Sequence, residues 1–161
     1  MTIFNRRDLF KSASLGVAAL TMASIVRAAP QERFAVRKTA SEWRRQLGPE
    51  RYRILREAGT ERAGTSPLDR EKRRGTYACA GCSLPLFSSA AKFESGTGWP
   101  SFFRAAPGAV LTKSDVSMGM RRTEALCRRC GGHLGHLFDD GPKPTGLRYC
   151  MNGLALTFRP A

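Results

Sequence analysis

Four cysteines in two CxxC pairs constrain the fold of this chain more than any other sequence feature. Cys79 and Cys82 form the first pair, Cys127 and Cys130 form the second, and residues 83–126 lie between them. Two such pairs can supply four thiolates to one tetrahedral zinc ion. Two disulfides or two redox dithiols are the alternatives, although a redox CxxC usually stands alone at the start of a helix. A zinc ion with four sulfur ligands would be structural, and it would hold two loops of a small domain together.

The length and composition of the chain fit one ordinary domain. It has 161 residues, of which 42% are hydrophobic and 25% charged, so it can bury a core. The formal net charge of +14 raises nucleic acid or a membrane surface as a partner. However, the basic residues are spread along the chain and form no dense run. We therefore expect no nucleic-acid partner.

The first 29 residues are typical of an export signal. Arg6 and Arg7 precede a weakly apolar stretch over residues 12–26, and the small residues Ala28 and Ala29 follow. This is the signal-peptide pattern, and the paired arginines indicate the twin-arginine route. A retained membrane anchor is the alternative, but the apolar stretch is short for a span. The sequence thus predicts a twin-arginine signal over 1–29, a linker over 30–40 and a domain over 41–161 that is periplasmic or otherwise exported.

The body of the chain is predicted to be mainly β. Ser41 can cap a short helical segment, which Gly48 and Pro49 interrupt. From Gly75 onward, short runs of aromatic and β-branched residues alternate with Gly, Pro and Ser, as in chains with many short strands. Such a pattern favours a small antiparallel sandwich or barrel. The expected strands are 76–79, 84–87, 101–103, 110–112, 120–125, 133–138, 147–151 and 156–158.

Cys150 is the one cysteine outside the two pairs. A buried cysteine in a strand is commonly only a small apolar residue. Here Arg148 and Asn152 are each two positions from Cys150, so on a strand all three face the same side. A guanidinium beside a thiol favours the thiolate, which is the nucleophilic form. Cys150 is therefore a candidate nucleophile.

Two further features suggest catalytic or ligand-binding roles. The only histidines, His133 and His136, lie three positions apart, and an imidazole can act as acid or base near neutral pH. Loop histidines are, however, more often solvated or structural. The glycines on either side of Thr97 predict a tight turn that presents Trp99. The indole then lies either in the core or at the surface, where it would form an aromatic wall for a small group such as a methyl.

These features belong to a series of motifs that follow one another along the chain. They are Cys79-x-x-Cys82, Gly96-Thr97-Gly98-Trp99-Pro100-Ser101-Phe102, Arg122-Thr123-Glu124, Cys127-x-x-Cys130, His133-Leu134-Gly135-His136, Asp140-Gly141-Pro142 and Gly146-Leu147-Arg148-Tyr149-Cys150-Met151-Asn152. In this order they resemble the B type of the methionine-R-sulfoxide reductase family. Gly59-Thr60-Glu61 is similar to the N-terminal segment of that family, so the resemblance runs from about residue 41 to residue 161.

The resemblance implies two small antiparallel sheets, a short helical N-terminal segment and a four-cysteine zinc site away from the active site. It implies that the Cys150 thiolate attacks the sulfur of a methionine-R-sulfoxide residue and becomes a sulfenic acid. His136, helped by His133, would protonate the oxygen, and Arg148 would hold the polarised oxygen and the thiolate. The expected substrate-binding residues are Trp99, against the substrate methyl, and Phe102. Asn152 is expected among the catalytic residues.

Thr97 departs from the pattern of the family. Many members have a second cysteine at this position, which would condense with the sulfenic acid and pass a disulfide to thioredoxin. Threonine cannot do this, and the other four cysteines are assigned to zinc. We therefore expect an external thiol to reduce the sulfenic acid: a thioredoxin-like protein, a glutaredoxin-like protein or a small thiol. The substrates would be oxidised proteins or peptides, and the enzyme a monomer.

Two other classes of protein compete with this interpretation. The first is a zinc-ribbon module that binds nucleic acid, motivated by the charge and the CxxC pairs. The second is an inactive relative that binds oxidised proteins without repairing them. The spread of the basic residues argues against the first class. The presence of Cys150, His136, Arg148 and Trp99 together argues against the second.

Overall fold

The computed structural model describes residues 34–161. The predicted signal over 1–29 and the first part of the predicted linker lie outside the described residues. None of the helices in residues 34–161 has both the length and the apolar character that a membrane crossing requires. Residues 34–39, predicted as linker, lie against the second CxxC turn, where the Val36 N–H donates to the Arg129 carbonyl at 2.9 Å.

The helical entry is α1, Ala40–Glu57. Thr39, and not the expected Ser41, is its N-cap, because the Thr39 hydroxyl accepts from the Glu42 N–H while the Glu42 carboxylate accepts from the Thr39 N–H. Gly48 has φ 69° and ψ 171°, so the predicted interruption of the helix is confirmed. Trp43 and Leu55, from the two halves, are both buried.

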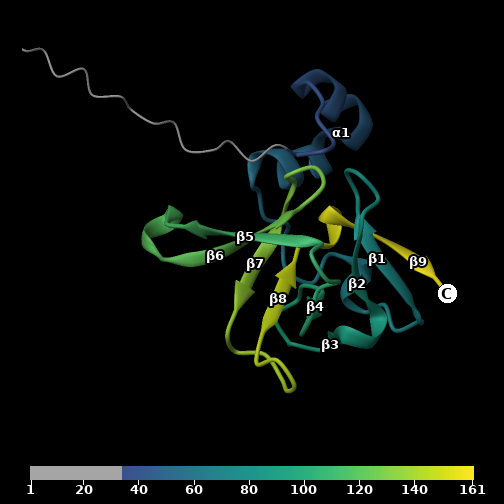
Figure 1. Cartoon of the computed structure of the whole chain (residues 1–161), viewed down its shortest axis with the longest axis vertical. Helices are drawn as coiled ribbons and strands as arrows, with labels where there is room; N and C mark the ends of the chain where they lie inside the picture. Colours follow the sequence, from purple (N-terminus) through teal and green to yellow (C-terminus); the bar gives the residue numbers. More distant parts are fainter. Residues whose placement is uncertain (1–33) are drawn as a thin grey trace, which may run out of the picture. The chain divides into compact units, whose positions relative to one another are not determined.

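Within residues 34–161 the strands form two antiparallel sheets, so the mainly β fold class is confirmed (Figure 1). One sheet has the order β2-β1-β9, and the other has the order β3-β4-β8-β7-β6-β5. The strands are β1 (Gly75–Cys79), β2 (Pro85–Ser88), β3 (Lys92–Phe93), β4 (Ser101–Phe102), β5 (Val110–Asp115), β6 (Arg122–Cys127), β7 (His133–Phe138), β8 (Arg148–Met151) and β9 (Leu156–Pro160). Short 3-10 helices are η1 (Pro67–Asp69), η2 (Ser89–Ala91), η3 (Ser117–Gly119) and η4 (Gly153–Ala155).

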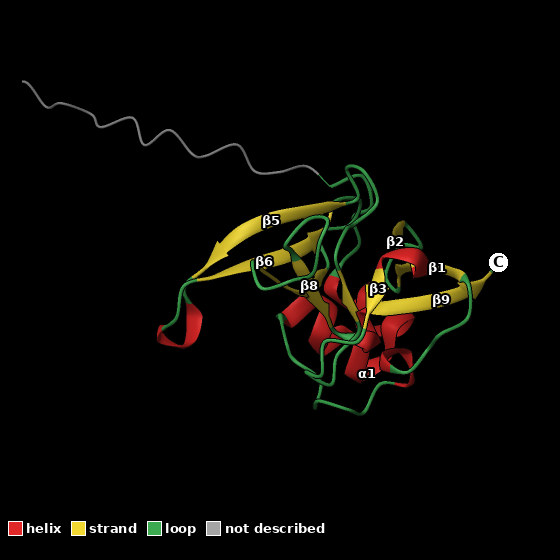
Figure 2. Ribbon diagram, turned by 90° about the horizontal axis from the view of Figure 1, so that it is seen from below, coloured by secondary structure: helices red, strands yellow, loops and turns green. Residues whose placement is uncertain are grey.

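Most expected strands agree with these bounds, and the hairpin of β5 and β6 differs most. The ladder continues from the pair Val110 and Cys127 to the pair Asp115 and Arg122, beyond the expected end at residue 112. Its outer part is polar, and backbone hydrogen bonds together with the ion pair of Arg122 with Asp115, at 2.7 Å, extend it past the apolar core. Figure 2 shows this hairpin reaching away from the rest of the sheet. The two-residue strand β3 was not expected, because it carries no apolar alternation.

An aromatic cluster joins the two sheets. The Phe102 ring of β4 stacks on the Phe87 ring of β2, with centroids 4.3 Å apart, and meets the Tyr77 ring of β1 edge-on at 4.9 Å. All three side chains are at most 1% exposed. Burial of aromatic rings of this size dominates the packing energy of a small core. The core therefore lies between β1 and β2 on one side and β4 on the other.

Candidate functional site

All four cysteines of the CxxC pairs meet at one point. Their sulfur atoms lie within 4.8 Å of one another, with 3.7 Å between Cys79 and Cys130 and 3.5 Å between Cys82 and Cys127. Zinc–sulfur bonds of about 2.3 Å in a tetrahedron separate the sulfurs by about 3.8 Å. The cluster is therefore of the right size and donor chemistry to hold a metal ion.

The backbone explains why the four sulfurs converge. Cys79 ends β1 and Cys127 ends β6, and each is followed by a tight turn that carries the second cysteine of its pair. The turns close through hydrogen bonds from the Ser83 N–H to the Cys79 carbonyl and from the Gly131 N–H to the Cys127 carbonyl. The Arg56 side chain of α1 also donates to the Cys130 carbonyl at 2.9 Å. The cluster thus joins both sheets and the helix.

Cys150 lies elsewhere, in β8, and opens on a separate cavity of about 130 Å³ that we call the reactive cavity. Cys150 is paired across the sheet with His136 of β7 and with Ser101 of β4. A Cβ atom at Gly135 would lie 2.1 Å from the Cys150 carbonyl oxygen, so only glycine allows β7 to pass this close to β8. The reactive cavity is lined by Thr60, Trp99, Arg122, Gly135, His136, Phe138, Cys150 and Asn152.

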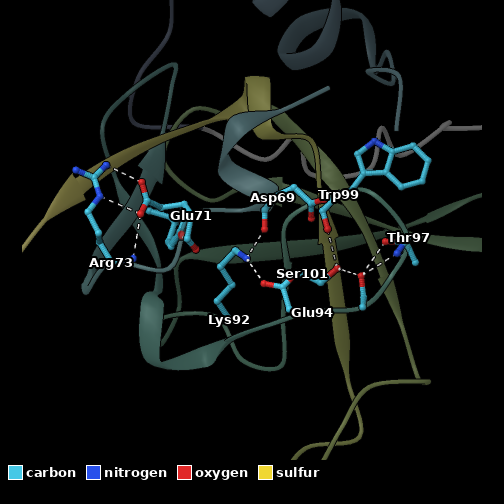
Figure 3. Close-up of polar contacts among 10 residues, drawn as sticks. Asp69, Glu71, Arg73, Lys92, Glu94, Thr97, Trp99 and Ser101 are labelled. Carbon is cyan, nitrogen blue, oxygen red and sulfur yellow. Dashed lines mark hydrogen bonds and ion pairs between the residues drawn. The ribbon is translucent and has the colours of Figure 1, made fainter. Parts of the chain in front are cut away.

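Hydroxyl groups surround the Cys150 sulfur. The Thr97 hydroxyl lies 3.8 Å from Sγ and is joined through Ser95 to the Ser101 hydroxyl, at 2.8 and 2.7 Å. Figure 3 shows Thr97, in the turn that carries Trp99, close to Ser101 at the start of β4. Burial raises the pKa of Cys150, and the Thr97 hydroxyl, the Arg148 charge and the Ser101 hydroxyl lower it by less. Burial thus favours the thiol form of Cys150 over the thiolate.

Arg148 is held in place by an acidic residue to which the sequence analysis assigned no role. Its Nε and Nη2 atoms donate to the two carboxylate oxygens of Asp140, each at 2.8 Å. The guanidinium lies 4.3 Å from the centre of the Phe138 ring. The pair with Arg148 lowers the pKa of Asp140. Because a two-bond pair fixes the plane of the guanidinium, Asp140 orients the charge that acts on Cys150. The sequence feature that could have indicated this role of Asp140 is the Asp140-Gly141-Pro142 motif.

The two histidines have different surroundings. His136 lines the reactive cavity, and its Nε2 is 2.8 Å from a carboxylate oxygen of Asp115. A carboxylate accepts, so Nε2 carries a proton. His133 is 3% exposed and pairs with Glu124 at 2.7 Å, and burial lowers its pKa. Its ring lies 5.5 Å from that of His136, behind the cavity wall.

Glu61 holds two walls of the reactive cavity, a role that the sequence analysis did not assign to it. Its backbone N–H donates to the Asn152 side chain at 2.9 Å, and its carbonyl accepts from the Trp99 indole at 3.2 Å. Its carboxylate accepts from the N–H groups of Gly153 and Leu154, at 2.6 and 2.9 Å. Glu61 is 4% exposed, so these bonds are shielded from water. Trp99 and Asn152 are positioned through this one residue.

The structure thus brings Cys150, His136, Trp99 and Asn152 to one cavity, with Arg148 beside the thiol. It does not bring Phe102 there. The Phe102 ring is fully buried against Phe87, so it offers no surface to a ligand and shapes the site only through the core.

Comparison with known proteins places this arrangement in a family. The SelR domain matches residues 47–160, which include the cysteine cluster and every residue of the reactive cavity. The chain belongs to the SelR domain family.

Curated relatives match this chain over nearly their whole length. The chain is 59% identical to "Peptide methionine sulfoxide reductase MsrB" of Thiobacillus denitrificans, over 76% of this chain and 94% of that protein. It is 54% identical to the protein of the same name from Leptospira interrogans, over 78% of this chain and 97% of that protein. The corresponding protein of Agrobacterium fabrum is 55% identical, over 78% of this chain and 93% of that protein.

The pKa of Cys150 supplies a test of the site in this SelR domain. Since Arg148 lowers that pKa, Arg148→Met removes the positive charge and raises the pKa further. We expect the pH midpoint of Cys150 alkylation by iodoacetamide to move upward. The rate at pH 7 falls about tenfold for each pH unit of that movement. Arg45→Met, at an exposed position of α1, is the control and leaves the midpoint in place. An unchanged midpoint in Arg148→Met would show that Arg148 does not act on the thiol.

Proposed function

We propose that this protein reduces methionine-R-sulfoxide residues of oxidised proteins and peptides to methionine, with Cys150 as the nucleophile. One observation carries the proposal: a thiol, an aromatic wall and an imidazole held by Asp115 line the same small cavity. Reduction of a sulfoxide needs these three groups, for attack on sulfur, for packing of the methyl and for protonation of oxygen. The names of the SelR relatives support the same reaction class.

The first step transfers the oxygen atom. Cys150 Sγ attacks the sulfoxide sulfur, and the sulfur–oxygen bond of the substrate breaks as Cys150 becomes a sulfenic acid. The methionine sulfur is reduced by two electrons, and the cysteine sulfur is oxidised by two. The proton of the Cys150 thiol passes to the oxygen with His136 as the relay. No proton or electron is left over.

The surrounding groups stabilise this step. The Arg148 guanidinium, oriented by Asp140, stabilises the negative charge that develops on sulfur and on the substrate oxygen. Burial disfavours the thiolate in the resting protein, so the thiolate forms only as the sulfoxide is protonated. The Trp99 indole, held by the Glu61 carbonyl, packs against the substrate methyl.

Turnover of separate epimers tests this function. With dithiothreitol and metal-loaded protein, we expect a peptide carrying the R epimer to be reduced and the S epimer to remain. Cys150→Ser should lower turnover by at least about a thousandfold, because the hydroxyl is a far weaker nucleophile, while metal content and melting temperature stay unchanged. Reduction of neither epimer by the wild-type protein would overturn the proposal.

An external thiol regenerates the enzyme. Thr97 lies 3.8 Å from the Cys150 sulfur but carries no sulfur with which a sulfenic acid could condense. A first external thiol therefore forms a mixed disulfide with Cys150 and releases water, and a second thiol restores the Cys150 thiol. A thioredoxin-like protein, a glutaredoxin-like protein or a small thiol would supply both thiols.

Thr97→Cys tests the regeneration step. The introduced sulfur would lie within reach of Cys150, so one turnover without external thiol should yield an internal disulfide. The wild-type protein should instead keep a sulfenic acid at Cys150, which dimedone traps. Intact-protein mass spectrometry separates the two products, since dimedone adds mass only to the wild type. An internal disulfide of Cys150 in the wild-type protein would contradict the scheme.

We propose zinc as the metal of the cysteine cluster. Four thiolate ligands suit zinc, and they leave no open position for chemistry, so the metal stabilises the fold only. Elemental analysis should find one zinc per chain, and Cys82→Ser should lower the zinc content and the melting temperature together. Iron in place of zinc, or a fully folded protein without metal, would contradict this assignment.

We also propose that the protein is exported by the twin-arginine route. The Arg6-Arg7 pair precedes an apolar stretch, and folding before export would let the cluster acquire its metal in the cytoplasm. Cell fractionation should find the protein outside the cytoplasm, and Arg6→Lys/Arg7→Lys should retain it inside. The control Lys11→Arg keeps the same net charge and should still be exported. Export of the double variant at the wild-type level would count against the twin-arginine route.

A further inference from the structure

A second, larger cavity adjoins the reactive one. Its volume is about 660 Å³, against about 130 Å³ for the reactive cavity. Thr60 and Asn152 line the reactive cavity, whereas the residues next to them in the chain, Glu61 and Gly153, line the second one. Neighbouring Cα atoms are about 3.8 Å apart. The same two stretches of chain therefore form walls of both cavities.

The second cavity is apolar inside and carries charged residues from α1 and from the 61–62 segment. Its large apolar side chains are Leu68, Leu154, Leu156 and Phe158. Its basic residues are Arg51, Arg53 and Arg62. Within residues 34–161, none of these three arginines forms an ion pair.

The second cavity has fewer acidic residues than basic ones, namely Glu50 and Glu61. Glu50 is exposed and unpaired in the described part of the chain. The Glu61 carboxylate is turned inward, where its two oxygens accept from the Gly153 and Leu154 N–H groups. Three arginine charges thus stand against the carboxylates of Glu50 and Glu61, and only that of Glu50 is free to bind a cation. The lining keeps an excess of one positive charge beside its apolar side chains, which complements an acidic ligand with apolar groups.

We propose that this cavity binds the part of the substrate polypeptide that flanks the methionine sulfoxide, and that it selects flanks with apolar and acidic side chains. The inference rests on the function proposed above. The sulfoxide side chain is uncharged, so any preference for acidic flanks must come from contacts made by the neighbouring residues of the substrate. Because the two cavities share the stretches of chain around residues 60–61 and 152–153, a polypeptide whose sulfoxide occupies the reactive cavity would carry its flanking residues toward the second one.

The test compares two peptides of equal length, each with one methionine-R-sulfoxide and an apolar residue beside it. One peptide carries aspartates on both flanks, and the other carries lysines at the same positions. At 0.15 M salt, where charges are screened beyond about 8 Å, we expect the KM of the lysine peptide to be about tenfold higher, since about 1.4 kcal/mol of charge interaction gives that factor. The values of kcat should agree within about twofold.

Arg62→Glu should reduce the KM ratio to below about three, and Arg51→Glu should act in the same direction. Comparing two peptides within one variant cancels any general loss of folding or activity. Arg45→Glu makes the same change in net charge at an exposed position outside the cavity and should keep the tenfold ratio.

Three other outcomes would contradict either the subsite or the proposed function. Equal KM values for both peptides in the wild-type protein would overturn the subsite while leaving the proposed function intact. An equal loss of preference in Arg45→Glu and Arg62→Glu would also overturn it, because net charge and not the cavity would then set the preference. Failure of the wild-type protein to reduce either peptide would instead reject the proposed function.

Discussion

The convergence of four cysteine sulfurs is the constraint on which the rest of the structure depends. Cys79 belongs to the three-stranded sheet and Cys127 to the six-stranded sheet, so their contact brings together strands from two separate ladders. The helix α1 is tied to the same point through Arg56. A metal ion bound there would add its binding free energy to folding, because the unfolded chain has no preformed site. The two sheets then pack through the rings of Phe87 and Phe102.

With the sheets joined in this way, the reactive cavity is built mainly from backbone positions. Cys150, His136 and Ser101 lie side by side because β4, β8 and β7 are neighbours in one ladder. Opposing influences then act on the Cys150 thiol. Burial disfavours the thiolate, while a hydroxyl and a guanidinium favour it, and burial prevails. In the scheme proposed above, Cys150 keeps its proton until the substrate oxygen accepts it.

Local sequence patterns predicted a large part of this arrangement. The CxxC spacing predicted the cluster, and the turn residues predicted most strands and the interruption of α1 at Gly48. The prediction of Ser41 as the N-cap was wrong by two positions. Thr39 and Ser41 are both good caps, and only the capping box with Glu42 decides between them. The outer part of β5, residues 113–115, was missed, because it carries no apolar pattern and is held by pairing with β6 and by the ion pair of Arg122 with Asp115.

The sequence by itself determined the chemistry that is available: four thiols with metal spacing, one further thiol, two imidazoles and an indole in a tight turn. These are properties of residue type and short spacing, which a linear sequence records directly. Only the tertiary structure decided which groups meet. It buried Phe102 in the core, joined Glu61 to Trp99 and Asn152, and paired Arg148 with Asp140 and His136 with Asp115. The contacts of Glu61 with Trp99 and Asn152 connect residues 38 and 91 positions apart, and sheet order and packing, not local propensity, set such distances.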